Sequence, residues 1–177
     1  SIEKPIPVKD QIVLQLNNAA LNHLDLWIQQ EQNSPYPDGI ILGSDGSGKV
    51  IAVSEEAQED LIGKSVVINP ALNWGNNPAV HGNGFSILGF PQHGTFADYL
   101  LISKKQIFEK PTHLSFEEAA ALPLAGLTAY RALFSRARLR PGEKVLITGI
   151  GGGAALFALQ FALVFQCKVY ITSSSNV

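Results

Sequence analysis

The segment from residue 141 to residue 173 limits most strongly how this chain can fold. It contains a short apolar run at 144–148, the turn Gly-Ile-Gly-Gly-Gly-Ala at 149–154, an apolar run to 165 and a second short run at 167–173. The short runs are typical of buried parallel strands. The long run, rich in Ala and Leu, predicts a helix that is apolar nearly all round. The segment therefore predicts a right-handed strand–turn–helix–strand unit.

The glycine turn has the spacing Gly149-x-Gly151-x-x-Ala154. In such a unit the first glycine permits the tight turn, the second lets a pyrophosphate approach the backbone, and a small third residue lets the helix pack on the strand. The N–H groups and the positive end of the helix dipole then face the phosphates. We therefore expect a dinucleotide at Gly149, Gly151, Gly152, Gly153 and Ala154. The alternative is a glycine-rich turn of some other α/β protein.

The residues after the second predicted strand bear on which dinucleotide binds. An acidic residue about 20 positions past the glycines binds the ribose 2′-hydroxyl of NAD. This chain instead has Ser173, Ser174, Ser175 and Asn176 there. Hydroxyl groups can donate hydrogen bonds to a 2′-phosphate, whereas a carboxylate would repel it. Ser173 and Ser174 therefore favour NADPH, although a serine run after a strand can also be an ordinary loop.

Composition excludes several classes of protein. Apolar residues make up 46% of the chain and charged residues 16%, so the chain can bury a core. A net charge of −2 without a basic run argues against nucleic acid or an anionic membrane as partner. The single cysteine, Cys167, excludes a disulfide framework and a cysteine-rich zinc site. No signal peptide or bilayer-spanning run is found, so we expect a cytoplasmic location.

The rest of the chain divides into a β-rich half and an α/β half. Short runs with strand character predict a barrel-like β domain, and they lie at residues 11–17, 40–42, 49–53, 63–68 and 94–102. A helix is expected after Asn22, and residues 69–90 are expected to be a surface loop.

Helices dominate from residue 115 onward. Ser115 followed by Glu118 forms a capping box, and helical segments are expected on both sides of Pro123. The predicted domains are residues 1–105 and 114–177. Because one strand–helix–strand unit leaves its sheet edge unpaired, we expect this chain to be a piece of a longer protein.

Four stretches of the chain together resemble the medium-chain dehydrogenase/reductase superfamily in order and spacing. They lie at residues 19–25, 42–50, 117–130 and 142–154. The resemblance implies an α/β plus β fold, in which a GroES-like β-barrel domain is followed by the start of a Rossmann dinucleotide-binding domain. It also implies an active site in the cleft between the domains, and a homodimer.

The zinc-dependent branch of this superfamily has metal ligands that are missing here. A cysteine is needed where Asn22 stands, a His-Glu pair where Ser44 and Asp45 stand, and a further Cys or Asp near residues 124–125. The chain has four histidines without paired metal spacing: His23, His81, His93 and His113. It therefore resembles the zinc-free quinone oxidoreductase-like branch, and no metal is expected. Asp45 is expected to orient the turn at 43–48.

The resemblance also implies residue roles. Asn22 would lie near the nicotinamide, and Asp25 near the ribose or the substrate. Thr128 would contact the nicotinamide, unless it is an ordinary helix residue. Trp27 would line the substrate pocket or, equally, belong to a core. His23 is the nearest titratable residue and is the candidate proton donor.

Without a metal to polarise a carbonyl group, hydride transfer must depend on positioning and on the cofactor. Quinones and α,β-unsaturated carbonyl compounds accept hydride readily, because the developing negative charge is delocalised. The sequence thus predicts an NADPH-dependent oxidoreductase acting on quinones or enones. Two alternatives stay open: a cofactor-binding protein with little catalysis, serving in sensing or structure, and a zinc-type alcohol dehydrogenase, which the missing ligands disfavour.

Overall fold

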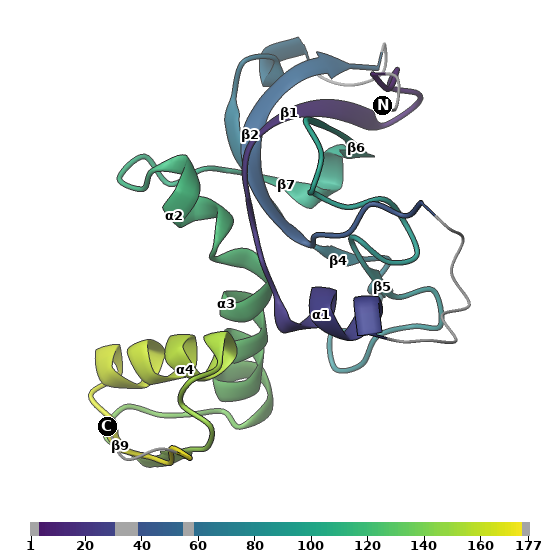
Figure 1. Ribbon diagram of the computed structural model, residues 1–177. Helices are drawn as coiled ribbons and strands as arrows, with labels where there is room; N and C mark the ends of the chain where they lie inside the picture. The colour runs from purple at the N-terminus through teal and green to yellow at the C-terminus, as the bar shows by residue number, and fades with distance from the viewer. Residues whose placement is uncertain (1–3, 31–38, 55–58, 175–177) are drawn as a thin grey trace. The chain divides into compact units, whose positions relative to one another are not determined.

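The computed structural model describes residues 4–30, 39–54 and 59–174 (Figure 1). The chain forms two compact units, Ser1–Leu124 and Ala125–Val177. This division falls later than the start of the predicted second domain at residue 114. The reason is that helix α2 (Phe116–Ala120) packs on the sheet of the first unit, where the Ser47 hydroxyl donates a 2.6 Å hydrogen bond to the Phe116 carbonyl.

The first unit is built on one antiparallel sheet with the strand order β6-β1-β2-β3-β7. Its strands are β1 (Gln11–Ala20), β2 (Asp45–Val53), β3 (Ser65–Ile68), β6 (Tyr99–Ser103) and β7 (Ile107–Glu109). Figure 1 shows β1 and β2 as two long, bent ribbons side by side. The remaining elements are α1 (His23–Gln30), the short helical turns η1 (Glu59–Leu61) and η2 (Lys104–Gln106), and the small pair β4 (Ala71–Leu72) and β5 (Ser86–Ile87).

The core of the first unit is built largely from the strands of this sheet. It consists of apolar side chains from several strands and loops: Ile12, Leu14, Val50, Val66, Ile68, Leu72, Leu88, Leu100 and Ile102. Val13 is also fully buried, and the β1–β2 register shifts between Val13 and Leu14. This irregularity explains why Val13 interrupts the alternation of the sequence.

One prediction for the first unit was wrong, and another is confirmed only in part. Residues 40–42 form no strand, and β2 begins instead at Asp45, so the segment expected to be a turn is a glycine-containing strand. Residues 69–90 are a surface loop in part: residues 75–84 are exposed and form no strand or helix, whereas β4 and β5 lie on either side of them and an aromatic cluster is present. In that cluster the Trp74 ring lies 5.1 Å from Phe85 and 5.7 Å from His81, between ring centres.

The second unit confirms the predicted strand–turn–helix–strand arrangement. Strand β8 (Lys144–Ile147) pairs in parallel with β9 (Lys168–Ile171), and α4 (Gly153–Val164) joins them. Before them, α3 (Pro123–Tyr130) continues into the π-helical segment η3 (Arg131–Arg136). The predicted burial of the strands was wrong: Leu146 is 65% exposed and Tyr170 46%. Within the described residues this sheet has two strands only, and these two side chains lack a covering layer.

The predicted capping box is confirmed, since Ser115 and Glu118 bond each other's main-chain N–H groups at the start of α2. Pro123 begins α3 rather than interrupting a helix, as suits a residue without an N–H group. No helix in the described ranges has the length and apolar character needed to cross a membrane.

Gly48 on β2 provides a test of this packing. A Cβ atom at this position would lie 2.2 Å from the main-chain oxygen of Gln15 on the paired strand β1. Gly48→Ala should therefore lower the free energy of unfolding by about 2 kcal/mol or more, measured by denaturant titration. Gly82→Ala is the matched control, because its Cβ would come no nearer than 3.7 Å to Trp74. Equal stability of the two variants would contradict this packing.

Candidate functional site

Asn22 stands between β1 and α1 and is held there through its main chain. Its N–H donates to Asp25 Oδ2 at 2.7 Å, and the Asp25 N–H donates to the Asn22 carbonyl at 3.0 Å. This is the arrangement of a side chain in the first helical turn that reaches back to the helix start. The other Asp25 oxygen, Oδ1, accepts from the Gly43 N–H at 3.1 Å. Asp25 is only 6% exposed. Through these two hydrogen bonds its carboxylate fixes the main chain at Asn22 and at Gly43.

The side chain of Asn22 is held by Asp45. Asn22 Nδ2 donates to Asp45 Oδ2 at 2.9 Å, while Asp45 Oδ1 accepts from the Leu124 N–H at 2.8 Å. Asp45 is 1% exposed. Its carboxylate thus connects Asn22 with the first turn of α3 and does not orient the 43–48 segment, so that expectation was wrong. No sequence pattern pointed to the Asp45–Asn22 pair, because the two residues lie on different elements.

Burial raises the pKa of Asp45 to about 6 from an ordinary value of 3.8. The hydrogen bonds from Asn22 and Leu124 oppose this rise, and the nearby negative charge of Asp25 adds to it. Desolvation is therefore the dominant effect, as is expected for a carboxylate away from water. Asp45 titrates closer to neutral pH than an exposed aspartate.

His23 and Trp27 lie on the outer part of α1. Both are exposed, Trp27 to 62%, and their rings are 5.2 Å apart between centres. Trp27 is thus no core residue, which removes one of its two predicted roles. The two rings form a solvent-accessible aromatic pair on the first turns of α1, which begins directly after Asn22.

The glycine turn in the second unit has the predicted conformation at its first position. Gly149 has a φ of 65°, in the left-handed region that favours glycine. Its N–H donates to Thr172 Oγ1 at 3.2 Å, and the Ile150 N–H donates to the Thr172 carbonyl at 3.1 Å. Thr172 therefore fixes the turn from the end of β9. Sequence reasoning missed this residue, although a hydroxyl side chain where two parallel strands end is a signal that could have found it.

The next three glycines are open toward solvent. A Cβ atom at Gly151 would meet nothing within 4 Å, and at Gly152 and Gly153 it would make only ordinary contacts at 3.6 and 3.5 Å. None of the three has a positive φ. The fold of the described chain thus needs no glycine at position 151.

The start of α4 also offers hydrogen-bond donors. Gly152 precedes the helix and supplies no side-chain cap. In the part of the chain that the structure describes, the N–H groups of Gly153 and Ala154 have no acceptor. Uncapped N–H groups beside positions without side chains fit the phosphates of a dinucleotide.

The other predicted cofactor residues lie in the second unit as well. Ser173 and Ser174 follow the end of β9 and are exposed, and Thr128 is exposed on α3. Ser175 and Asn176 lie outside the described residues. Asn22, His23 and Asp25 belong to the first unit.

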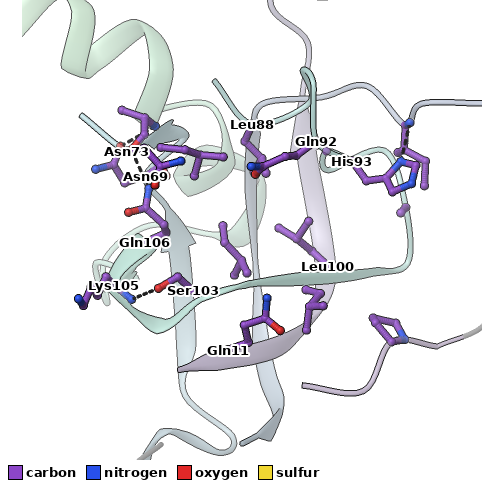
Figure 2. A pocket seen from close by; sticks show the side chains of 18 of the residues that line it. Gln11, Asn69, Asn73, Leu88, Gln92, His93, Leu100, Ser103, Lys105 and Gln106 are labelled. Atoms are coloured by element: carbon purple, nitrogen blue, oxygen red, sulfur yellow. Dashed lines mark hydrogen bonds between the residues drawn. The ribbon is translucent and has the colours of Figure 1, made fainter. Parts of the chain in front are cut away.

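A hollow of about 1220 Å³ in the first unit contains none of the predicted site residues. Figure 2 shows the amides of Asn69, Asn73 and Gln106 on one side of it and Leu100 beneath. Gln106 Nε2 donates to the carbonyls of Asn69 and Ala71 at 2.9 and 2.7 Å. Asn69 Oδ1 accepts from the Ala71 N–H at 3.0 Å, so the amides of Gln106 and Asn69 hold the neighbouring backbone.

Metal-binding side chains do not gather anywhere in residues 4–30, 39–54 and 59–174: no group of three or more His, Cys, Asp or Glu could hold a metal ion there. Asn22, Ser44 and Asp45 occupy positions where the resemblance implies zinc ligands in the zinc branch. Of these, only Asp45 has a charged group that could bind a metal, and both oxygens of its carboxylate already accept hydrogen bonds. Zinc independence stays a prediction.

The raised pKa of Asp45 predicts a pH-dependent contribution to stability. A folded-state pKa of about 6 against 3.8 makes this contribution fully present below pH 3.8 and lost as pH rises through 6. The difference corresponds to about 3 kcal/mol. The wild type should therefore lose stability as the pH rises from 4 to 6.5. Asp45→Asn cannot ionise at this position and should not show that loss, so its free energy of unfolding should rise relative to that of the wild type over this pH range. If denaturant titrations of the wild type and of Asp45→Asn gave the same pH dependence of stability, the raised pKa of Asp45 would be contradicted.

Comparison with known proteins finds dehydrogenases and oxidoreductases. Residues 8–112 match the family model "Alcohol dehydrogenase GroES-like domain". The chain is 34% identical to a "Zinc-type alcohol dehydrogenase-like protein YogA" of Leptosphaeria maculans, covering 99% of this chain and 52% of that protein. It is 27% identical to the "Quinone oxidoreductase" of Homo sapiens, covering 99% of this chain and 47% of that protein.

Among solved structures, an "NAD-dependent alcohol dehydrogenase" superposes with a TM-score of 0.91 at 37% identity, covering 99% of this chain and 53% of that one. The chain thus spans about half the length of these relatives. The family match covers more than half of the chain and includes Asn22, Asp25 and Asp45. The chain belongs to the alcohol dehydrogenase GroES-like family, within the medium-chain dehydrogenase/reductase superfamily.

Proposed function

We propose that this chain is part of an NADPH-dependent oxidoreductase that transfers hydride to quinones or α,β-unsaturated carbonyl compounds without zinc. The observation that carries the proposal is the open glycine turn, where Gly151 is required neither by its φ nor by packing. A dinucleotide pyrophosphate against the backbone supplies the missing reason for glycine there. Its relatives with oxidoreductase names support the reaction class.

The chain's own residues would hold the cofactor by its phosphates. The N–H groups of Gly151, Gly153 and Ala154 would donate to the pyrophosphate, with Gly149 and Gly152 shaping the turn. Ser173 and Ser174 would donate to the 2′-phosphate, and Thr128 would contact the nicotinamide. A bound NADPH supplies the hydride.

In the first unit, Asn22 would contact the nicotinamide. Asp25 has both oxygens engaged by main-chain N–H groups, which supports a role in holding Asn22 rather than in touching the ribose or the substrate. The exposed ring of His23 would pass a proton from water to the product, and Trp27 beside it would line the substrate pocket. A homodimer and a cytoplasmic location complete the proposal.

The "zinc-type" name of one relative supports a second candidate, a zinc-dependent alcohol dehydrogenase. The residues present disfavour it, because Asn22 and Ser44 replace the thiol and imidazole that zinc prefers. Metal analysis of the purified protein decides between the two: about one zinc per chain would favour the second candidate.

The cofactor preference tests the proposal directly. NADPH should bind the full-length protein at least tenfold more tightly than NADH, since hydroxyls and no carboxylate follow β9. Fluorescence titration measures both affinities, and NADPH oxidation with a panel of quinones, enones and simple ketones measures turnover. Tighter binding of NADH would overturn the assignment of Ser173, and binding without turnover would favour a non-catalytic cofactor-binding protein.

Substitution of Gly151 separates cofactor binding from folding. Gly151→Ala adds a methyl group in open space, so stability should stay unchanged. The same methyl group would displace the pyrophosphate, and NADPH affinity should fall at least tenfold, about 1.4 kcal/mol. Gly82→Ala, the same change in the first unit, should bind NADPH like the wild type. Unaltered affinity in Gly151→Ala would place the phosphates elsewhere.

A further inference from the structure

We propose that Asp45 is a positioning residue that determines which end of the Asn22 amide is presented to a ligand. The inference rests on the proposed function in one respect, the placement of Asn22 at the nicotinamide. It assigns Asp45 a role toward Asn22 that neither the sequence patterns nor the relatives' names indicate.

The geometry around Asp45 leaves Asn22 one orientation. An ionised carboxylate only accepts hydrogen bonds, so the Asn22 amide must turn its NH₂ group toward Asp45 Oδ2, 2.9 Å away. The Asn22 backbone cannot rotate to compensate, because its N–H is fixed by Asp25 at 2.7 Å. Asn22 Oδ1 is consequently directed away from Asp45 and accepts no hydrogen bond from the part of the chain that the structure describes. Asn22 thus presents an acceptor.

Asp45 itself cannot adjust. Its second carboxylate oxygen accepts from the Leu124 N–H at 2.8 Å, and its main-chain oxygen accepts from Thr95 Oγ1 at 2.8 Å. The residue is almost fully buried. Asp25 on α1 is the charged group that acts on it. A carboxylate with all its contacts fixed holds its neighbour more firmly than water could.

Because Asn22 presents the acceptor Oδ1, the site should prefer a ligand that carries an N–H donor there. The carboxamide of nicotinamide has an N–H group that could donate to Asn22 Oδ1, whereas a 3-acetylpyridine ring has a methyl group there. Losing one such hydrogen bond in a partly buried site weakens binding about tenfold. The wild type should therefore bind NADP⁺ about tenfold more tightly than its 3-acetylpyridine analogue.

Asp45→Asn should reverse the orientation of Asn22. The new side chain must use its oxygen to accept from Leu124, so its NH₂ group faces the Asn22 NH₂ group. Two donors cannot pair, and the Asn22 amide flips to present its NH₂ group instead. Both ligands carry a carbonyl that this group can bind, so the tenfold preference should fall below about threefold. The neutral side chain suits a buried position, and the variant is expected to fold.

The experiment measures the affinities of both ligands by calorimetry in the full-length wild type, in Asp45→Asn and in Thr95→Val. Thr95→Val is the matched control, since it removes the hydrogen bond to the Asp45 main chain but leaves the carboxylate and Asn22 in contact. The control should keep the tenfold preference. An unchanged preference in Asp45→Asn, with NADP⁺ still bound, would overturn the proposal.

A second readout does not depend on the cofactor. The side-chain NH₂ resonances of Asn22, followed by NMR from pH 4.5 to 8, should shift with an inflection near pH 6 in the wild type and in Thr95→Val, and should show none in Asp45→Asn. If the wild type binds neither ligand, the proposed function fails while this titration still tests Asp45. If Asp45→Asn binds neither ligand while the wild type binds both, the NMR titration decides whether Asp45 holds the Asn22 amide. Wild-type resonances without an inflection would overturn the role of Asp45.

Discussion

The conformation of one short turn determines what the second unit can do. Gly149 leaves β8 with a φ of 65°, and Thr172 at the end of β9 holds the turn through hydrogen bonds to Gly149 and Ile150. The chain can then start α4 with a glycine that supplies no cap. Donors that a side chain would usually satisfy are left for another partner. The parallel pairing of β8 and β9 is what brings Thr172 to this turn.

The first unit uses buried charge for a similar purpose. Asp25 and Asp45 are both nearly inaccessible to solvent, and each accepts two hydrogen bonds from separate segments. Burying a carboxylate is unfavourable, and the raised pKa of Asp45 reflects that. These hydrogen bonds make the site rigid, because Asn22, at the junction of β1 and α1, has both its main chain and its side chain fixed. A preorganised polar group of this kind suits ligand orientation.

Sequence patterns predicted the parts of the fold that depend on local chemistry. The glycine spacing, the apolar run of α4 and the Ser115–Glu118 cap all act within a few residues, and the structure confirms each. They did not predict where β2 begins, because the residues Gly46 to Gly48 have turn-like composition and are held extended only by pairing with β1 and β3. The hydrogen bond of Thr172 to Gly149 and that of Asp45 to Asn22 were missed because each joins residues that are distant in sequence. The roles of Asn22, Asp25, His23 and Thr128 came from resemblance and stay predictions.

The central claim is that the amide groups at the start of α4 bind the pyrophosphate of a dinucleotide. It is tested most directly by following the main-chain amide resonances of the isotope-labelled protein during titration with NADP⁺. We predict that the amides of Gly151, Gly153 and Ala154 shift most within the glycine-rich segment and saturate together with binding. Saturation of the protein with NADP⁺ while these three resonances stay in place would contradict the account.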